Sequence, residues 1–270
     1  MNLGRSIARG SRSTVHAWGN DGVAKVPVDG TPDSWIRSEA AFSTAAHEVG
    51  APVPEFLGFD EHEGRVVSIF RRAVGALMWD ALVAAPKQID EHARRLVDLQ
   101  AVLAALVPPV VLPSQTDRLS SKIRSAADRF DPALVAALDD VPTPQRVVLC
   151  HGDMHPGNVI LTLDGPVVVD WFDASRGDPV CDVARTTILL SAESGTAHLA
   201  GVHVDLLARL HESYVGAATQ RFGFDRHRLH RWRAVGAVAR IAEGVPAHAL
   251  AEIWRRWSES PSHEVAGDQA

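Results

Sequence analysis

One segment in the second half of the chain restricts the possible folds more than any other. It reads His151-Gly152-Asp153-Met154-His155-Pro156-Gly157-Asn158. Its glycines and its proline prevent a continuous helix or strand, so the backbone has to turn between Asp153 and Asn158. The polar side chains of this segment are therefore expected to line a loop.

A β-hairpin is predicted directly after this loop. Apolar, β-branched residues stand on both sides of Asp164-Gly165, and that pair is a strong signal for a two-residue hairpin turn. A turn centred there places Val159 opposite Asp170 and closes the hairpin with Asp170 beside Asn158. The side chains of Asp153, Asn158 and Asp170 are then expected to converge on one cleft.

These residue types suit the transfer of a γ-phosphoryl group. In that reaction the protein mainly positions the reactants, and magnesium bridging the phosphates supplies much of the charge neutralisation. Magnesium prefers oxygen ligands and keeps several waters, so the Asn158 amide oxygen and the Asp170 carboxylate can supply a minimal protein site. A separate carboxylate, Asp153, can orient an acceptor hydroxyl and take its proton.

The segment from Val148 to Leu190 resembles the aminoglycoside phosphotransferase family of small-molecule kinases, which share the protein-kinase-like fold. The resemblance is carried by H-G-D-M-H-P-G-N, by V-D-W, and by Gly-Asp-Pro and Asp-Val-Ala elements at positions 177–179 and 182–184. It implies one role for each matching position: catalysis by Asp153, metal binding by Asn158 and Asp170, and structural support of the catalytic loop by His151 and a buried Asp182.

A kinase-like enzyme also needs a strand lysine that holds the nucleotide phosphates and a helical acid that holds the lysine. Lys25 is the single charge in a short apolar strand. Residues 33–49 read as a helix that Thr31 can cap and Gly50 can end. Glu39 lies on the apolar stripe of that helix, where an unpaired carboxylate is unfavourable. Lys25 and Glu39 are therefore the expected pair.

Two further segments of the N-terminal third are expected to contact the nucleotide. Near Gly10 a turn between two strands stands where a loop would cover the phosphates, and the amides and hydroxyls of Ser11 and Ser13 can donate to phosphate oxygens. Gly10 would permit a close backbone approach. By position, a later segment resembles the connection between the two lobes, where main-chain groups of Arg71 and Ala73 would bind adenine.

The wider pattern predicts an α+β chain with a bilobal, protein-kinase-like fold. Residues 1–72 are expected to form an N-terminal antiparallel-sheet lobe that binds the nucleotide, and residues 73–270 a larger, mainly helical lobe for catalysis and acceptor binding. Several stretches of the second lobe show helical patterns, namely Leu96 to Leu106, 180–191, 204–221 and 227–242.

Composition and charge restrict the classes of partner that this chain is expected to bind. The formal charge of −6 disfavours nucleic acid, which calls for a basic surface, and is compatible with a cationic acceptor. No apolar run of 18 residues occurs and the first residues lack the apolar segment of a signal peptide, so a cytoplasmic protein without a membrane partner is expected. The two cysteines form no disulfide or zinc framework, and Cys150 is expected to be buried and apolar.

The expected activity is therefore the phosphorylation of a small-molecule hydroxyl by ATP, or alternatively GTP, with Mg²⁺. The resemblance implies an aminoglycoside, an amino sugar, a choline-like alcohol or a related metabolite as acceptor. In the C-terminal half, Glu243, Asp205 and Glu212 are candidates to meet a cationic acceptor.

Three other interpretations compete with this one. His151, Asp153 and His155 stand at alternate positions and can be read as the zinc site of a metallohydrolase, although Pro156 then breaks the strand. A nucleotide-binding module without catalysis would be expected to lack a lysine, base or metal ligand, and none is missing. A protein kinase would need a longer activation segment after Asp170.

Overall fold

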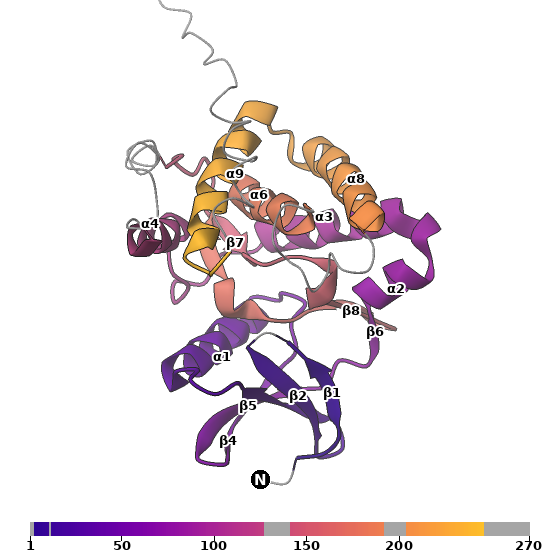
Figure 1. Ribbon diagram of the computed structural model, residues 1–270, viewed down its shortest axis with the longest axis vertical. Helices are drawn as coiled ribbons and strands as arrows, with labels where there is room; N and C mark the ends of the chain where they lie inside the picture. The colour runs from indigo at the N-terminus through magenta and orange to yellow at the C-terminus, as the bar shows by residue number, and fades with distance from the viewer. Residues whose placement is uncertain (1–2, 11, 127–140, 192–203, 246–270) are drawn as a thin grey trace, which may run out of the picture.

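The computed structural model of the protein describes residues 3–10, 12–126, 141–191 and 204–245, and these fold into two lobes (Figure 1). A sheet and one helix form the N-terminal lobe, while the other helices gather in the larger second lobe. This is the bilobal α+β architecture that the sequence predicts. The position of the lobe boundary, between residues 72 and 73, stays a prediction.

The N-terminal lobe is built on a five-stranded antiparallel sheet with the strand order β1-β2-β3-β5-β4. Its strands are β1 (Ser6–Arg9), β2 (Ser13–Trp18), β3 (Gly22–Pro27), β4 (Phe56–His62) and β5 (Arg65–Arg71). Ala24 and Val26 of β3 pack with Val67 and Ile69 of β5 in a buried cluster. Because side chains alternate along a strand, Lys25 points to the opposite face of the sheet.

Helix α1 (Asp33–Glu48) packs against β5 and reaches the second lobe. Its end agrees with the prediction, since Gly50 adopts a φ of 88° directly after it. It also begins at Asp33, as predicted, but the predicted cap is wrong, because Pro32 and not Thr31 is the N-cap residue and no side chain caps the helix. Trp35, one helical turn before Glu39 on the same face, stays 47% exposed, and its ring centroid lies 5.3 Å from that of Phe172.

The second lobe packs its helices around one large apolar core that includes Leu96, Leu103, Trp171, Tyr214 and Trp232. Among the described helices, none is both long and apolar enough to cross a membrane. The helices are α2 (Met78–Ala84), α3 (Ile89–Ala105), α4 (Gln115–Ala126), α6 (Pro179–Leu190), α8 (Val204–Phe222) and α9 (Arg226–Ile241), with short 3-10 turns at η1 (Pro86–Gln88), η3 (Pro156–Asn158) and η4 (Trp171–Asp173).

Short strands carry the loop that the sequence singled out. Strand β7 (Val148–Cys150) pairs with β10 (Ser175–Gly177), and β8 (Val159–Thr162) pairs with both β6 (Gly75–Leu77) and β9 (Gly165–Val168). Cys150 is buried at the end of β7, as expected. The segment from residue 151 to 158 therefore lies between a buried strand and a hairpin.

The hairpin forms, but its predicted register is wrong by two residues. Thr162 pairs with Gly165 and Val159 with Val168, so Leu163 and Asp164 form the turn. The reason is the Thr162 hydroxyl, which accepts a hydrogen bond from the Asp164 amide and donates one to the Gly165 carbonyl oxygen. Asn158 consequently faces Val169, whose amide donates to the Asn158 carbonyl oxygen at 2.9 Å, and Asp170 follows one residue later.

Candidate active site

The loop after β7 turns at Gly152, and this position requires glycine. Its φ is 77°, and a Cβ atom there would lie 2.3 Å from the carbonyl oxygen of Asp173. The chain therefore reverses in close contact with η4. Asp153 therefore lies at the start of the loop, directly after the residue that contacts η4.

The carboxylate of Asp182, on α6, forms a hydrogen bond with the backbone of this loop. Its Oδ1 accepts the amide of Gly152 at 2.7 Å and its Oδ2 accepts the side-chain amide of Gln100 at 3.1 Å. Burial raises the pKa of the Asp182 carboxyl, while these hydrogen bonds favour its charged form. Asp182 is thus bonded to the backbone of this loop, and the supporting role that the resemblance implies stays a prediction.

His151 is buried and uses both ring nitrogens on the main chain. Nδ1 accepts the amide of Asp153 at 3.2 Å, and Nε2 lies 3.1 Å from the carbonyl oxygen of Val169. Burial lowers the pKa of His151, so the ring is neutral, with the proton on Nε2 donated to Val169. The ring also packs edge-on against Trp171, with centroids 4.9 Å apart. His151 thus connects the loop of residues 151–158 to Val169, which precedes Asp170.

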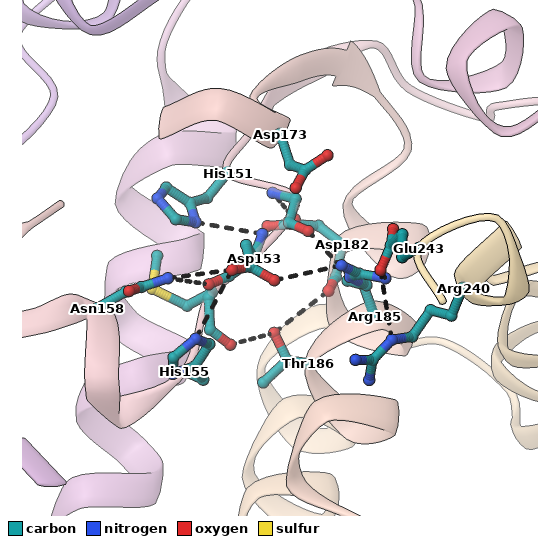
Figure 2. A network of polar contacts seen from close by, with 12 residues as sticks. His151, Asp153, His155, Asn158, Asp173, Asp182, Arg185, Thr186, Arg240 and Glu243 are labelled. Carbon is teal, nitrogen blue, oxygen red and sulfur yellow. Dashed lines mark hydrogen bonds and ion pairs between the residues drawn. The ribbon is translucent and has the colours of Figure 1, made fainter. Parts of the chain in front are cut away.

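Three neighbours hold the carboxylate of Asp153 (Figure 2). Asn158 donates to Oδ2 at 3.2 Å, His155 Nε2 lies 3.7 Å from the same oxygen, and Arg185 donates to Oδ1 at 3.3 Å. Burial alone would raise the pKa of Asp153, but the nearby His155 ring and the charge of Arg185 hold it well below the usual range. Asp153 is therefore ionised at neutral pH and can accept a hydrogen bond from a hydroxyl.

Asn158 and Asp170 offer the oxygens that the sequence predicts for magnesium. The Asn158 amide nitrogen donates to both the carbonyl oxygen and Oδ2 of Asp153, which leaves its Oδ1 for a cation. Asp170 has a left-handed backbone, φ 65° and ψ 67°, and its side chain is 45% exposed. One amide oxygen and one accessible carboxylate fit the preference of Mg²⁺ for oxygen ligands.

The zinc-site interpretation is not supported by these contacts. His151 bonds main-chain groups through both ring nitrogens, and His155 Nδ1 accepts the Gly157 amide at 3.0 Å. Throughout the described part of the chain, no three His, Cys, Asp or Glu side chains are grouped so as to hold a metal ion.

The predicted contact between Lys25 and Glu39 is confirmed, and it extends to Asp170. The Lys25 ammonium donates to Glu39 Oε1 and, at 3.2 Å, to Asp170 Oδ1. Burial by itself would lower the pKa of Lys25, but the charges of Asp170 and Glu39 raise it above its ordinary value. The amine therefore stays protonated and joins the sheet of one lobe to the hairpin of the other.

Of the predicted phosphate-covering loop, Ser11 lies outside the described residues. Ser13 is buried and lines the same cavity as Lys25 and Asp170. The Gly10 amide closes the turn on the carbonyl oxygen of Ser13 at 2.8 Å, and a Cβ at Gly10 would make only an ordinary contact with that oxygen. The turn itself therefore does not demand glycine at position 10.

In the connection between the lobes, Arg71 and Ala73 differ in which main-chain hydrogen-bonding groups are available to a ligand. The Arg71 amide donates to the carbonyl oxygen of Glu55 at 2.8 Å, and the Arg71 side chain pairs with Glu55 and Asp21. Within the described residues the Ala73 amide makes no hydrogen bond. Ala73 can therefore donate to a nucleotide base, whereas Arg71 can contribute only its carbonyl oxygen.

Sequence reasoning missed Arg185 and did not predict its contacts with Asp153 and Glu243. Arg185 follows Asp182 by one helical turn, which places both side chains on the same face of α6 and could have indicated it. Arg185 donates to Asp153 and, through Nη1 at 3.0 Å, to Glu243. Two arginines were also missed beside Phe172, whose ring centroid lies 5.0 Å from the guanidinium of Arg12 and 5.7 Å from that of Arg118.

Replacing Gly152 with alanine is expected to disturb the loop that presents Asp153. A non-glycine residue in the left-handed region costs about 1–3 kcal/mol, and the contact with Asp173 adds to this. We expect a lower melting temperature and strongly reduced turnover, measured by calorimetry and an activity assay. The matched control is Gly216→Ala in α8, where a Cβ meets nothing within 4 Å and alanine should be neutral or stabilising. Wild-type behaviour of Gly152→Ala would contradict the described loop.

Comparison with known proteins places this geometry in a family. The sequence model of the Phosphotransferase enzyme family matches residues 4–204, which include the N-terminal sheet, the loop of residues 151–158 and the hairpin. The chain belongs to this family. A search of curated proteins gives no significant match.

Solved structures with the family's fold are similar over most of their length. An aminoglycoside-3'-phosphotransferase of type VIII has a TM-score of 0.60 at 20% identity, covering 86% of this chain and 90% of the other. A choline/ethanolamine kinase family protein from Mesorhizobium loti has a TM-score of 0.59 at 18% identity, covering 97% and 89%. APH(3'')-Id from Streptomyces rimosus, in complex with ADP and streptomycin, has a TM-score of 0.53 at 17% identity, covering 84% and 90%. These similarities confirm the protein-kinase-like fold.

Proposed function

We propose that this chain is an ATP- and magnesium-dependent phosphotransferase that phosphorylates a hydroxyl group of a small molecule. The observation that carries the proposal is the position of Lys25, which bonds Glu39 on α1 and Asp170 after β9 at once. A lysine joined to a helical acid and placed beside the metal-binding aspartate is the arrangement that kinase-like enzymes use to hold nucleotide phosphates.

Each polar group near the cleft then has one task. Lys25 holds the α- and β-phosphates and Glu39 orients Lys25. Asn158 Oδ1 and the Asp170 carboxylate hold Mg²⁺, which neutralises charge on the phosphates when bound. Asp153, ionised and fixed by Asn158 and Arg185, orients the acceptor hydroxyl and takes its proton.

The nucleotide is proposed to bind between Ser13 and the connection between the lobes. Arg71 offers a main-chain acceptor and Ala73 a main-chain donor, which is the pair that the edge of an adenine ring requires. Related structures contain GDP in some cases and ADP in others, so ATP is proposed as the phosphoryl donor with GTP as the alternative. The assay below compares ATP with GTP. Because the donor is a cellular nucleotide, we propose the cytoplasm as the place of the reaction.

The acceptor class is proposed from the family and its neighbours. The names of the related structures include streptomycin and the choline/ethanolamine kinase family, so the acceptors of this fold differ widely. Aminoglycosides, amino sugars, choline-like alcohols and related metabolites form the first test set. A nucleic-acid or membrane partner is not part of the proposal.

The proposed function is tested by ADP release from Mg·ATP with and without a panel of hydroxylated acceptors. Acceptor-dependent, magnesium-dependent ADP release together with a phosphorylated product supports the kinase. Tight binding of Mg·ATP without turnover, for any acceptor, would instead favour a nucleotide-binding module. Parallel reactions with GTP identify the preferred donor.

Replacing Lys25 with methionine is expected to lower kcat/KM for Mg·ATP by about 10²–10³-fold, as is typical for removing one preorganised charge from a reacting centre. Methionine keeps much of the side-chain volume but leaves Glu39 and Asp170 without their shared cation. Steady-state kinetics at varied Mg·ATP measure the loss. Lys87→Met, at an exposed position in η1, is the matched control and should behave as wild type. Unimpaired kinetics of Lys25→Met would remove Lys25 from the site.

A further inference from the structure

One face of helix α6 bonds the loop that carries Asp153 at the residues on both sides of it. Asp182 Oδ1 accepts the amide of Gly152 at 2.7 Å, and the hydroxyl of Thr186 donates to the carbonyl oxygen of Met154 at 2.9 Å. Asp182 and Thr186 are four positions apart, which places them on the same face of the helix. Figure 2 shows both side chains directed toward the loop. The residues before and after Asp153 are thus bonded to two side chains of one helix.

A single buried side chain, Gln100 of α3, connects these two contacts. Its amide nitrogen donates to Asp182 Oδ2 at 3.1 Å and to the Thr186 hydroxyl oxygen at 3.2 Å, which uses both of its N–H groups. The hydroxyl of Thr186 has one proton, and the Met154 oxygen is closer to it than the Asp182 carbonyl oxygen, which lies at 3.4 Å. The two contacts with the loop are therefore coupled through one amide group.

Tyr214 of α8 fixes the orientation of the Gln100 amide. Its hydroxyl donates to Gln100 Oε1, which directs the amide nitrogen toward α6. Burial raises the pKa of Tyr214 above its ordinary value, so the hydroxyl keeps its proton and serves as a donor. A reversed amide would place Oε1 against the Asp182 carboxylate, and two acceptors cannot form a hydrogen bond. The donors and acceptors of this network therefore have one consistent arrangement.

The network is polar at positions where apolar side chains could fill the same space. Its four members are all buried, namely Gln100, Asp182, Thr186 and Tyr214. Replacing bonded polar groups in a core by apolar groups of similar shape is often neutral or stabilising, so fold stability alone does not require them. A fully bonded buried network does, however, give a rigid and specific arrangement. Because its outer bonds end at residues 152 and 154, that rigidity acts on the residue between them.

We infer that Gln100, Thr186 and Tyr214 are positioning residues for Asp153, acting through the backbone of its loop and without contact to either substrate. The inference rests on the proposed function, in which Asp153 orients the acceptor hydroxyl and takes its proton. Misplacing a catalytic group by about 1 Å can reduce the rate on the order of 10²-fold. A network that holds both neighbours of Asp153 therefore contributes to kcat.

The network is expected to affect turnover more than nucleotide binding. Within the described residues, no hydrogen bond joins Gln100, Thr186 or Tyr214 to Lys25 or Asp170, the groups proposed to hold the phosphates and the metal ion. Loss of the network should therefore lower kcat and leave KM for Mg·ATP close to that of the wild type. A purely structural role would instead lower the melting temperature and leave the kcat of the folded protein unchanged.

The first test compares two neighbouring threonines of α6 that have different partners. Thr186 and Thr187 are both fully buried, but the Thr187 hydroxyl donates to the Ala184 carbonyl oxygen within its own helix. Thr186→Val removes the hydroxyl and keeps the side-chain shape, and we expect kcat to fall about 10-fold with KM for Mg·ATP changed less than about two-fold. Thr187→Val is the matched control and should keep the wild-type kcat. Wild-type kcat of Thr186→Val overturns the inference.

A serine at position 186 separates the hydroxyl from the packing of the side chain. Thr186→Ser keeps the hydroxyl and removes one methyl group, so it should lose stability and keep most of kcat. Steady-state kinetics and calorimetric melting temperatures measure the two properties. If Thr186→Ser loses as much kcat as Thr186→Val, or if kcat follows melting temperature through the series with Thr187→Val, the contact serves only the fold and the inference is wrong.

The centre of the network is tested by combining Gln100→Met with Tyr214→Phe. The combination removes the amide together with the hydroxyl that donates to it, so the melting temperature should fall less than for Gln100→Met alone, which leaves the Tyr214 hydroxyl unpaired. We expect kcat of the double variant to stay about 10-fold below that of the wild type, because the loop contacts are no longer coupled. Recovery of kcat together with the melting temperature would show a structural network and contradict the inference.

Hydrogen exchange of the Gly152 amide, followed by NMR, reports on the loop without any acceptor. We expect faster exchange than in the wild type for Thr186→Val and the double variant, and unchanged exchange for Thr187→Val. If the wild type is an active kinase but neither kcat nor exchange changes in the variants, the inference fails and the proposed function stands. If the wild type phosphorylates no acceptor, the proposed function fails and the catalytic part of the inference with it, while exchange still shows whether the network orders the loop.

Discussion

Replacing Asp153 with asparagine is expected to lower kcat by about 10²–10⁴-fold, the usual contribution of a positioned general base. Asparagine preserves the shape and keeps one acceptor oxygen for Asn158 or Arg185, while its amide nitrogen faces the other donor. It can no longer take the proton of the acceptor hydroxyl. Because Asp153 contacts neither Lys25 nor Asp170, the affinity for Mg·ATP should stay close to that of the wild type. Steady-state kinetics and calorimetric titration with Mg·ATP measure the two effects separately.

Asp98→Asn, at an exposed position of α3, controls for a general effect of removing one negative charge. A matched loss of kcat and of nucleotide binding in Asp153→Asn would indicate a distorted loop instead of a missing base. Full turnover by Asp153→Asn would exclude Asp153 as the base and leave the phosphotransferase proposal without a catalytic residue.

The parts of the site that the sequence predicted are those in which a single residue type has a strong local consequence. Gly152 and Pro156 force a turn, and the chain turns there. A carboxylate on an apolar helix stripe needs a cation, and Glu39 bonds Lys25. Both arguments depend only on the chemistry of one position and its near neighbours. The catalytic and binding roles assigned to these residues stay predictions.

For the hairpin, the local sequence is compatible with two turns, and the predicted turn is the wrong one. Asp164-Gly165 is a good turn pair, but Thr162 can bond its own turn through the hydroxyl, and the two choices differ by two positions of register. Because side chains alternate with period two, a shift of two residues leaves every side chain on its predicted face. Asp170 thus still reaches Lys25, although its predicted neighbour across the hairpin was wrong.

The cations that surround Glu243 could not have been predicted from local signals. Lys122 and Glu243 are 121 positions apart, and their contact depends on how α4 packs against α9. Helical periodicity indicates which face of each helix is apolar, but not which charged residues of two helices will meet. For this reason Glu243 was proposed as a partner of a cationic substrate, while the structure surrounds it with three cations of the protein.

Replacing Asp170 with asparagine is expected to weaken binding of Mg·ATP and to lower kcat/KM at least about 10²-fold, since a metal ion can supply several kcal/mol of charge stabilisation. Asparagine is preferred to alanine because it tolerates the left-handed backbone, φ 65°, that Asp170 adopts. The variant thereby removes one charge from the metal site without straining the turn after β9. Calorimetric titration of Mg·ATP and kinetics at varied Mg²⁺ measure the result.

Asp170 also accepts a hydrogen bond from Lys25, so the loss of a metal ligand has to be distinguished from the loss of this contact. ATP binding measured in EDTA makes the distinction, because a metal-specific role leaves metal-free affinity unchanged, whereas a disturbed Lys25 lowers it. Asp164→Asn, at the exposed turn of the same hairpin, is the matched control. If Asp170→Asn binds Mg·ATP as the wild type does, Asn158 would be left as the single predicted protein ligand, and a one-ligand site cannot account for a magnesium-dependent reaction at this cleft.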